Sequence, residues 1–236
     1  MNLEHELQRK IILKLIHNPS MSFNELWGKE GESNAFAYHL NKLEEQGLVE
    51  KKDNSYRLTS EGKKLSAFIE GDSGDKAKFP TLNHFLIIRN GDKFLLQKRL
   101  KEPFYGYWGF ISGKINFGWN VLECAKRDFK EETGLDAENL VLRGLEQTKT
   151  IENSNILYHH LQFIVEISKV SGKLIEKTHK AENEWMTLEE YKSRNSFPLD
   201  AIGDMFDSDK FFLIEVERTM KDGKFVGSKV VSKKCL

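Results

Sequence analysis

The most informative stretch of this chain is GKINFGWNVLECAKRDFKEETGL, residues 113–135. Asp128, Glu131 and Glu132 recur at spacings of three and four, which places side chains on one face of a helix. Crowded carboxylates repel one another, so such a face favours a hard divalent cation. Mg²⁺ or Mn²⁺ takes oxygen ligands and is commonly shared between carboxylates and substrate phosphates. The stretch therefore predicts a helix that binds a metal ion and a phosphate-containing ligand.

The same stretch resembles the Nudix box, G-x5-E-x7-R-E-U-x-E-E-x-G-U, in which U is aliphatic. The residues that match are Gly113, Arg127, Glu131, Glu132, Gly134 and Leu135. Two acidic positions differ, because Trp119 stands at the first glutamate and Asp128 at the glutamate after the arginine. Residues 108–114, WGFISGK, look like the W-x-x-P-G-G-K lead-in of the family, and the resemblance covers residues 79–204.

The resemblance implies an α/β Nudix fold, with a mixed sheet sandwiched by helices, that hydrolyses a nucleoside diphosphate linked to another group. It implies that Glu131 and Glu132 are the principal metal ligands, and that Asp128 is a further ligand or a base for water. Arg127 would orient Asp128 through a charge-assisted hydrogen bond. Trp119 either packs against its neighbours or stacks on a nucleobase. The residues assigned to substrate binding are Gly113, Lys114 and Trp119.

The composition predicts a soluble cytoplasmic protein of one or two domains. The chain has 236 residues, of which 39% are hydrophobic and 31% charged, and no run reaches the length of a membrane span. Its two cysteines, Cys124 and Cys235, have no metal or redox spacing, so we expect free thiols. The formal net charge is zero, which excludes a global attraction to nucleic acid.

A polar stretch divides the chain. Residues 70–78 read EGDSGDKAK and precede Phe79-Pro80, which is the composition of a linker. We therefore predict an N-terminal domain over residues 1–70, a linker over 71–79 and a Nudix domain with a C-terminal extension over 80–236.

Residues 1–70 show a helical pattern that ends in a hairpin. The expected elements are helices over 7–16, from Ser22 and over 33–46, a hairpin over 48–58 around Asp53-Asn54, and a last helix from Thr59 or Ser60. This order resembles a winged helix-turn-helix, mostly α with a β-hairpin wing. Residues 37–63, AYHLNKLEEQGLVEKKDNSYRLTSEGK, look like the recognition helix and wing of arsenic-repressor-like and multiple-antibiotic-resistance-repressor-like regulators.

This second resemblance implies DNA binding by a homodimer. The residues expected near a groove are Ser33, Asn34, Tyr38, His39 and Lys42, and those expected near phosphates are Lys51, Lys52 and Arg57. Charge argues the other way, because residues 1–75 hold ten Lys and Arg against thirteen Asp and Glu. The alternative is a small helical module used for dimerisation or protein contact.

After the linker, strands alternate with one strong helix. The expected elements are strands over 82–89, 93–98, 156–167 and 173–177, a helix over 120–133, and a strand followed by a helix over 184–190. Residues 211–220 fit either a helix that ends near Gly223 or a strand in a hairpin around Asp222-Gly223.

Two functions follow from these patterns. The first is a nucleotide-responsive transcriptional regulator, whose Nudix domain binds a nucleoside diphosphate derivative, with or without slow hydrolysis. The alternative is an active Mg²⁺-dependent Nudix pyrophosphohydrolase with an accessory winged helix. The winged helix and the acid missing at Trp119 favour the regulator, whereas Arg127, Glu131 and Glu132 favour the enzyme.

Overall fold

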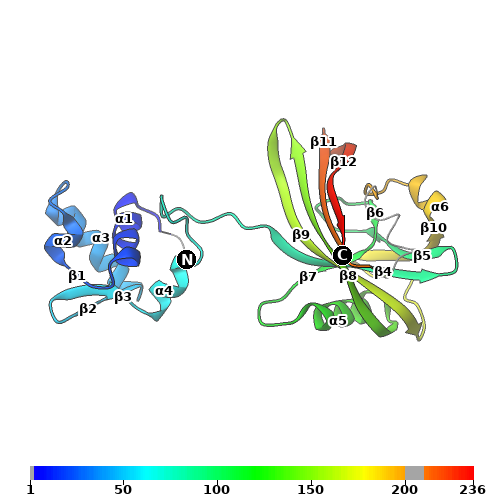
Figure 1. Cartoon of the computed structure of the whole chain (residues 1–236), viewed down its shortest axis with the longest axis horizontal. Coiled ribbons are helices and arrows are strands. Elements are labelled where there is room, and N and C mark those ends of the chain that lie inside the picture. The colour runs from blue at the N-terminus through cyan, green and yellow to red at the C-terminus, as the bar shows by residue number, and fades with distance from the viewer. Residues whose placement is uncertain (1–2, 200–209) are drawn as a thin grey trace. The chain divides into compact units, whose positions relative to one another are not determined.

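The computed structural model describes residues 3–199 and 210–236, which form two compact units, Met1–Phe79 and Pro80–Leu236. Figure 1 shows the first unit in blue to cyan and the second in green to red. Residues 200–204, the end of the expected family resemblance, lie outside the described part of the chain. Among the described residues, no helix combines the length and the apolar character that a membrane span requires.

The N-terminal unit consists of helices and a small antiparallel sheet with the strand order β1-β3-β2. Its elements are α1 (Glu6–His17), β1 (Met21–Ser22), α2 (Phe23–Trp27), α3 (Ser33–Glu45), β2 (Val49–Lys52), β3 (Ser55–Leu58) and α4 (Ser60–Ser66). The apolar stripes of α1 and α3 meet in one core, which includes Ile11, Ile12, Phe36 and Leu40. The helices and the hairpin expected in this unit are confirmed.

Local sequence signals explain these boundaries. The Ser22 side chain accepts a hydrogen bond from the backbone N–H of Glu25, and the Glu25 side chain accepts one from that of Ser22. This capping box begins α2 where the sequence predicted a helix. Asp53 and Asn54 have φ of 50° and 61°, the left-handed conformations of a two-residue hairpin turn. Strand β1, only Met21–Ser22, was not predicted because two residues carry no periodicity.

The stretch predicted as a linker contains a hydrogen-bonded turn. The backbone N–H of Glu70 donates to the carbonyl oxygen of Asp75 at 2.7 Å, and that of Ala77 donates to Phe68 at 3.0 Å. The Asp75 carboxylate also lies 3.3 Å from Arg9 of α1. The polar residues predicted as a linker therefore include a turn that packs on the N-terminal unit.

The C-terminal unit is built on a mixed sheet with the strand order β10-β5-β4-β9-β8-β11-β12. Its elements are β4 (Thr81–Asn90), β5 (Lys93–Arg99), β6 (Trp108–Gly109), β7 (Ile111–Lys114), α5 (Val121–Thr133), β8 (Asp136–Glu152), β9 (Asn155–Ser171), β10 (Ala181–Thr187), α6 (Leu188–Lys192), β11 (Phe212–Lys221) and β12 (Lys224–Cys235). Strands β4 and β9 are parallel, as are β8 and β11, and the other pairs are antiparallel. The expected α/β class with a mixed sheet is confirmed.

Side chains of strand β4 pack into the cores on both faces of this sheet. Phe85 and Ile87 join a core cluster that includes Tyr191 of α6, whereas Leu86 joins a second cluster with Phe129 of α5. This alternation follows from the two-residue period of a strand. Helix α5 covers one face of the sheet in Figure 1, and the residues on that face of β4 contact it.

The structure corrects one expectation, adds a strand and settles one open choice. Residues 173–177 are not a strand; the backbone N–H of Ile175 instead donates to Thr133 at the end of α5. Strand β8 was not predicted. The open choice for the tail is settled, because β11 and β12 form a hairpin that runs beside β8–β9 (Figure 1).

Candidate functional site

Helix α5 carries the acidic residues, and its ends are fixed by local signals. The Asn120 side chain accepts from the backbone N–H of Glu123 at 2.9 Å, and Gly134 ends the helix with φ of 73°. The two caps bound α5 at the residues, 120–133, over which a helix was predicted. Cys124, Ala125 and Phe129 are fully buried against the sheet, so the opposite side of the helix is left for polar residues.

Asp128 lies at the centre of the site, and both of its carboxylate oxygens are engaged. Arg127 donates to Oδ1 through Nε at 2.9 Å and Nη2 at 2.6 Å, while Oδ2 lies 2.9 Å from Nε2 of His84. An ionised carboxylate only accepts, so Nε2 of His84 donates. Burial alone would raise the pKa of Asp128, but the hydrogen bonds from His84 and Arg127 outweigh it and lower the pKa.

His84 was not predicted as a site residue. It is fully buried on β4, and its Nδ1 has no hydrogen-bond partner among the described residues. The sequence did offer an indication, because His84 lies within the mostly apolar residues 82–88. Burying a polar ring there costs free energy unless the ring has a hydrogen-bond partner.

Gly113 is held in place by the same pair. A Cβ atom at this position would lie 2.0 Å from Oδ2 of Asp128 and 2.7 Å from Nε2 of His84. The first glycine of the box is therefore required by close packing in this chain. Lys114 follows on β7 and is exposed.

Trp119, at the position of the missing acid, contacts Arg127. The guanidinium carbon lies 4.8 Å from the centre of the indole ring, a cation–π distance, and the Trp119 side chain remains 48% exposed. Arg127 is thus held between an aromatic ring and the carboxylate of Asp128.

Glu131 and Glu132 do not converge with Asp128 on one point. The Glu131 side chain is exposed and lies 4.0 Å from Nε of Arg127, whereas Glu132 accepts a hydrogen bond from Gln97 at 3.3 Å. Among the described residues, no three His, Cys, Asp or Glu side chains group as a metal site. The donors therefore do not form a three-carboxylate cage. They fit the other common arrangement, in which Mg²⁺ is held by one or two carboxylates together with ligand phosphates.

Gln97 and Arg99 extend the site along β5, and neither was predicted. Gln97 joins Glu132 to Asn183, with 3.1 Å between its Nε2 and Oδ1 of Asn183. Burial lowers the pKa of Arg99, against the opposing charges of Glu102 and Glu132. The Lys98-Arg99 pair at the end of an apolar strand was the available signal in the sequence.

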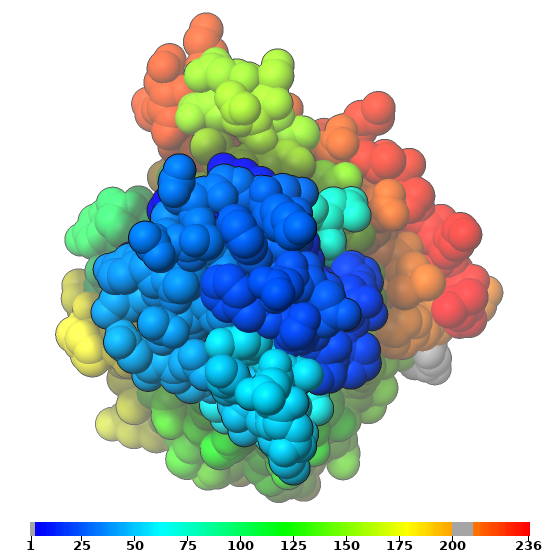
Figure 2. All heavy atoms as spheres, turned by 90° about the vertical axis from the view of Figure 1, so that its left-hand side faces the viewer, coloured from blue at the N-terminus to red at the C-terminus, as the bar shows by residue number. Residues whose placement is uncertain are grey.

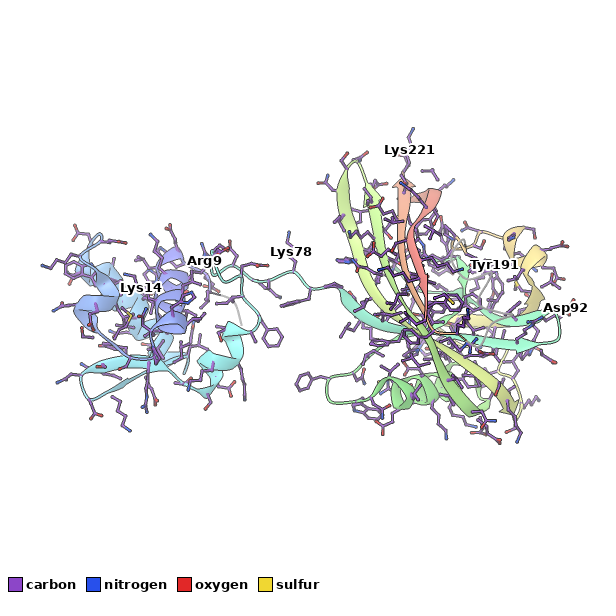
Figure 3. All side chains as sticks on the ribbon, viewed as in Figure 1. Arg9, Lys14, Lys78, Asp92, Tyr191 and Lys221 are labelled. Carbon is purple, nitrogen blue, oxygen red and sulfur yellow. The ribbon has the colours of Figure 1, made fainter. Side chains whose placement is uncertain are left out.

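A cavity of about 190 Å³ lies in the C-terminal unit. Strands β4, β8 and β9 contribute to its lining, as does the β11–β12 hairpin. Tyr191 of α6, labelled in Figure 3, also lines the cavity. Its hydroxyl donates to the carbonyl oxygen of Phe197 at 2.7 Å and lies 3.1 Å from that of Trp108.

In the N-terminal unit, α3 and the β2–β3 hairpin carry the residues expected to contact DNA. Figure 2 shows one face of this unit, in blue to cyan, as a continuous surface. Ser33 and Asn34 lie in the first turn of α3, and Lys51 and Lys52 are exposed on β2.

The remaining expected DNA contacts touch other residues of the unit, and so does Lys51, whose Nζ lies 5.5 Å from the centre of the Tyr56 ring. The Tyr38 ring, although 57% exposed, lies 5.2 Å from that of His39, and Lys42 pairs with Glu45 at 2.8 Å. His39 stacks on His5 with 3.8 Å between ring centres, and burial together with the charge of His5 lowers its pKa. On the hairpin, Arg57 pairs with Glu50 at 2.6 Å.

Comparison with known proteins gives two family matches. Residues 80–203 match the model of the NUDIX domain, and residues 2–69 match a domain of unknown function, DUF7347. The second match gives no support to a winged helix. A curated relative, the uncharacterized Nudix hydrolase YvcI of Bacillus subtilis, is 23% identical over 114 residues, which are 48% of this chain and 70% of that protein.

Solved structures resemble the C-terminal unit. A mutator MutT protein from Bacillus halodurans superposes with a TM-score of 0.51 at 22% identity, over 64% of this chain and 97% of the other. The NUDIX domain of Shewanella oneidensis NrtR, solved with ADP ribose, gives a TM-score of 0.42 at 16% identity, over 58% and 88% of the two chains. At these identities the likeness concerns the fold.

Nudix hydrolases generally use divalent metals such as Mg²⁺ and bind nucleoside diphosphate derivatives. In this chain the mixed sheet, the capped helix α5 and the residues of the box lie within the matched region. Because that region, residues 80–203, is more than half of the 236-residue chain, the chain belongs to the NUDIX domain family.

Proposed function

We propose that this protein is a nucleotide-responsive transcriptional regulator. Its Nudix domain binds a nucleoside diphosphate derivative, and its N-terminal unit acts as a winged helix that binds DNA as a homodimer. The observation that carries the proposal is the state of Asp128, whose two oxygens are occupied by Arg127 and His84. A carboxylate engaged in this way positions α5 well but is poorly free to take a metal ion or a proton from water.

Trp119 replaces the first glutamate of the Nudix box, and this replacement supports a domain that senses a ligand. Trp119 removes one carboxylate from the box and contacts Arg127 through its ring. Ligand binding tolerates such a change, whereas catalysis depends on interactions that strengthen in the transition state and is sensitive to displaced charges. We therefore propose ligand binding as the main role of the Nudix domain and slow hydrolysis as at most a residual activity.

The ligand would bring its cation with it. Glu131 and Glu132 are the carboxylates that remain to hold Mg²⁺ or Mn²⁺, shared with the ligand phosphates. When bound, the cation neutralises the charge of the diphosphate. Lys114 is exposed on β7 beside Gly113 and is the proposed phosphate contact of the chain itself, together with Arg99.

The order of elements in the N-terminal unit supports DNA binding. Helices α1, α2 and α3 precede the β2–β3 hairpin, and β1 closes a three-stranded sheet, as a winged helix requires. Tyr38 is exposed on α3, and Lys51 and Lys52 are exposed on the hairpin. Because Arg57 is paired with Glu50, the two lysines are the main proposed phosphate contacts.

The alternative is an active Mg²⁺-dependent Nudix pyrophosphohydrolase with an accessory N-terminal domain. The bond from Arg127 to Asp128, with Glu131 and Glu132 retained, is the observation that favours it. Phosphate release on nucleoside diphosphate derivatives, at a rate that depends on Glu131 and Glu132, would identify the protein as this enzyme.

The deciding experiment is a fluorescence anisotropy titration of the full chain against genomic DNA fragments, with and without nucleoside diphosphate derivatives and Mg²⁺. We expect sequence-selective binding that the nucleotide shifts, and linkage then requires DNA to shift nucleotide affinity by the same factor. Absence of selective binding at moderate salt would remove the regulator and leave the hydrolase.

A charge-matched pair of variants tests the hairpin. Lys51→Ala with Lys52→Ala should weaken binding to all DNA sequences alike and reduce the slope of log affinity against log salt by about 2. Lys63→Ala with Lys64→Ala on α4 removes the same charge and should leave the slope nearly unchanged.

A further inference from the structure

The cavity of the C-terminal unit contains a carboxylate whose hydrogen-bonding capacity is half used. Glu146 of β8 is 1% exposed, and its Oε1 accepts from Thr148 at 2.6 Å and from Gln162 at 3.2 Å. Nη2 of Arg218 lies 3.6 Å from the same oxygen. Among the described residues, Oε2 of Glu146 and Nε of Arg218 have no hydrogen-bond partner. Leaving a buried carboxylate oxygen without a hydrogen-bond donor costs free energy. A ligand that donates to Oε2 would therefore be bound favourably.

The other walls of the cavity are aromatic. Phe104 and Phe225 lie with their ring centres 5.3 Å apart and nearly parallel, and Phe197 lies within 5.5 Å of both. Tyr158 of β9 packs on Phe104 at 5.3 Å. Aromatic faces beside an acceptor that cannot donate suit a flat ring with N–H groups at its edge.

The size of the cavity limits what it can hold. Its volume of about 190 Å³ is below the ~300–1,000 Å³ that is usual for the site of a whole ligand. It therefore suits one ring system, with the rest of the ligand outside.

Strand β5 connects the cavity with helix α5. Gln97 and Arg99 are two residues apart, so they project from one face of the strand about 7 Å from each other. Gln97 donates to Glu132, and Arg99 lines the cavity. A ligand with its ring in the cavity can thus bring a diphosphate beside Arg99 and towards Glu132.

We infer that the cavity binds the base of the nucleotide and that Glu146 selects a base with N–H donors. Guanine fits best, since its ring N–H and its exocyclic amino group lie side by side and Oε2 has two free lone pairs. The inference rests on the proposed binding of a nucleoside diphosphate derivative and adds the class of base.

The selectivity depends on a segment beyond the family match. Arg218 of β11, which pairs with Glu146, and Phe225 of β12, which forms an aromatic wall, both follow residue 203. The C-terminal hairpin therefore completes the base-binding site.

The test is isothermal titration calorimetry of the full chain with GDP and with IDP in the presence of Mg²⁺. IDP lacks only the exocyclic amino group of GDP. We expect GDP to bind about tenfold more tightly, the size of effect of a hydrogen bond to a charged group. Glu146→Gln should abolish the difference between GDP and IDP, because an amide oxygen is neutral and its NH₂ repels the donors of the base.

Two further variants separate selection from general damage. Glu138→Gln, on an exposed part of β8 where Glu138 pairs with Lys169, should retain the GDP preference. Phe225→Ala should weaken GDP and IDP by the same factor, about tenfold, because stacking does not distinguish the edges of a base.

The outcomes are distinguishable. Equal affinities for GDP and IDP in the unchanged protein, or a Glu146→Gln variant that keeps the ratio between them, would overturn the inference but leave nucleotide binding in place. Binding of neither nucleotide, when an adenine nucleoside diphosphate derivative does bind, would overturn the inference alone. Binding of none of the three would also overturn the proposed ligand class. Failure to bind DNA would affect the proposed regulator alone.

Discussion

The contact between Asp128, His84 and Gly113 is the tightest point of the site. The carboxylate bonds to a histidine that is fully buried on another element, and the glycine backbone lies against both side chains. In this chain Asp128 stands where the family pattern has the longer glutamate. The shorter side chain bonds directly to His84, which explains how the replacement is accommodated.

At this scale we predict that Gly113→Ala destabilises the C-terminal unit. The new Cβ would lie 2.0 Å from Oδ2 of Asp128, so the His84 contact must break or the strand must move, which costs about 1–3 kcal/mol. Hydrogen-exchange protection of β4 and β9 amides would measure the loss. Gly227→Ala meets no atom within 4 Å and is the matched control; equal protection in the two variants would contradict the packing argument.

Helix α5 shows how an element places several functional groups at once. Its capping box at Asn120 fixes the first turn, and its buried side fixes the rotation about the axis. Arg127, Asp128 and Glu131 then project together because of helical spacing alone. The direction of the helix relative to β5 is set by the bonds of Gln97 and Asn183 to Glu132.

At the scale of the element we predict that Asn120→Ala lowers the stability of the C-terminal unit by about 1 kcal/mol. The backbone N–H of Glu123 would lose its 2.9 Å acceptor. Chemical denaturation, followed by near-ultraviolet circular dichroism, would measure the difference. Asn120→Asp retains an acceptor and should stay close to the unchanged protein; if it lost as much stability as Asn120→Ala, the cap would not be the cause.

The whole molecule consists of two compact units, each with its own buried core. The N-terminal core is made of α1, α2, α3 and the hairpin, and none of the described residues of the C-terminal unit belongs to it. Two separate cores favour separate cooperative unfolding, since each unit buries a set of apolar residues of its own.

We therefore predict two calorimetric transitions. A nucleotide that binds the Nudix domain should raise the midpoint temperature of only one transition. At a free concentration 100 times the dissociation constant, it should increase the free energy of unfolding of that unit by about 2.7 kcal/mol. That transition should be the one that Gly113→Ala lowers. A single transition would show that the units unfold together. So would two transitions whose midpoints both rise when nucleotide is added.

The boundaries of several elements could be predicted from nearby residues alone. Ser22 with Glu25, Asp53-Asn54, and Asn120 with Gly134 act through contacts within a few residues, so their patterns predicted the boundaries that the structure confirms. The mixed α/β class followed from the resemblance of residues 113–135, which the fold supports.

Contacts between residues far apart in the sequence could not be predicted and are seen only in the folded chain. His84 meets Asp128 across 44 positions, and Glu146 meets Arg218 across a connection that includes several strands. The tail forms a hairpin whose strand β11 pairs in parallel with β8. Residues 173–177 do not form the expected strand, and the backbone N–H of Ile175 instead donates to Thr133 at the end of α5. Periodicity reports which side of an element is apolar, but it does not report which element covers that side. The partners of Asp128 and the walls of the cavity therefore appeared only when the chain was folded.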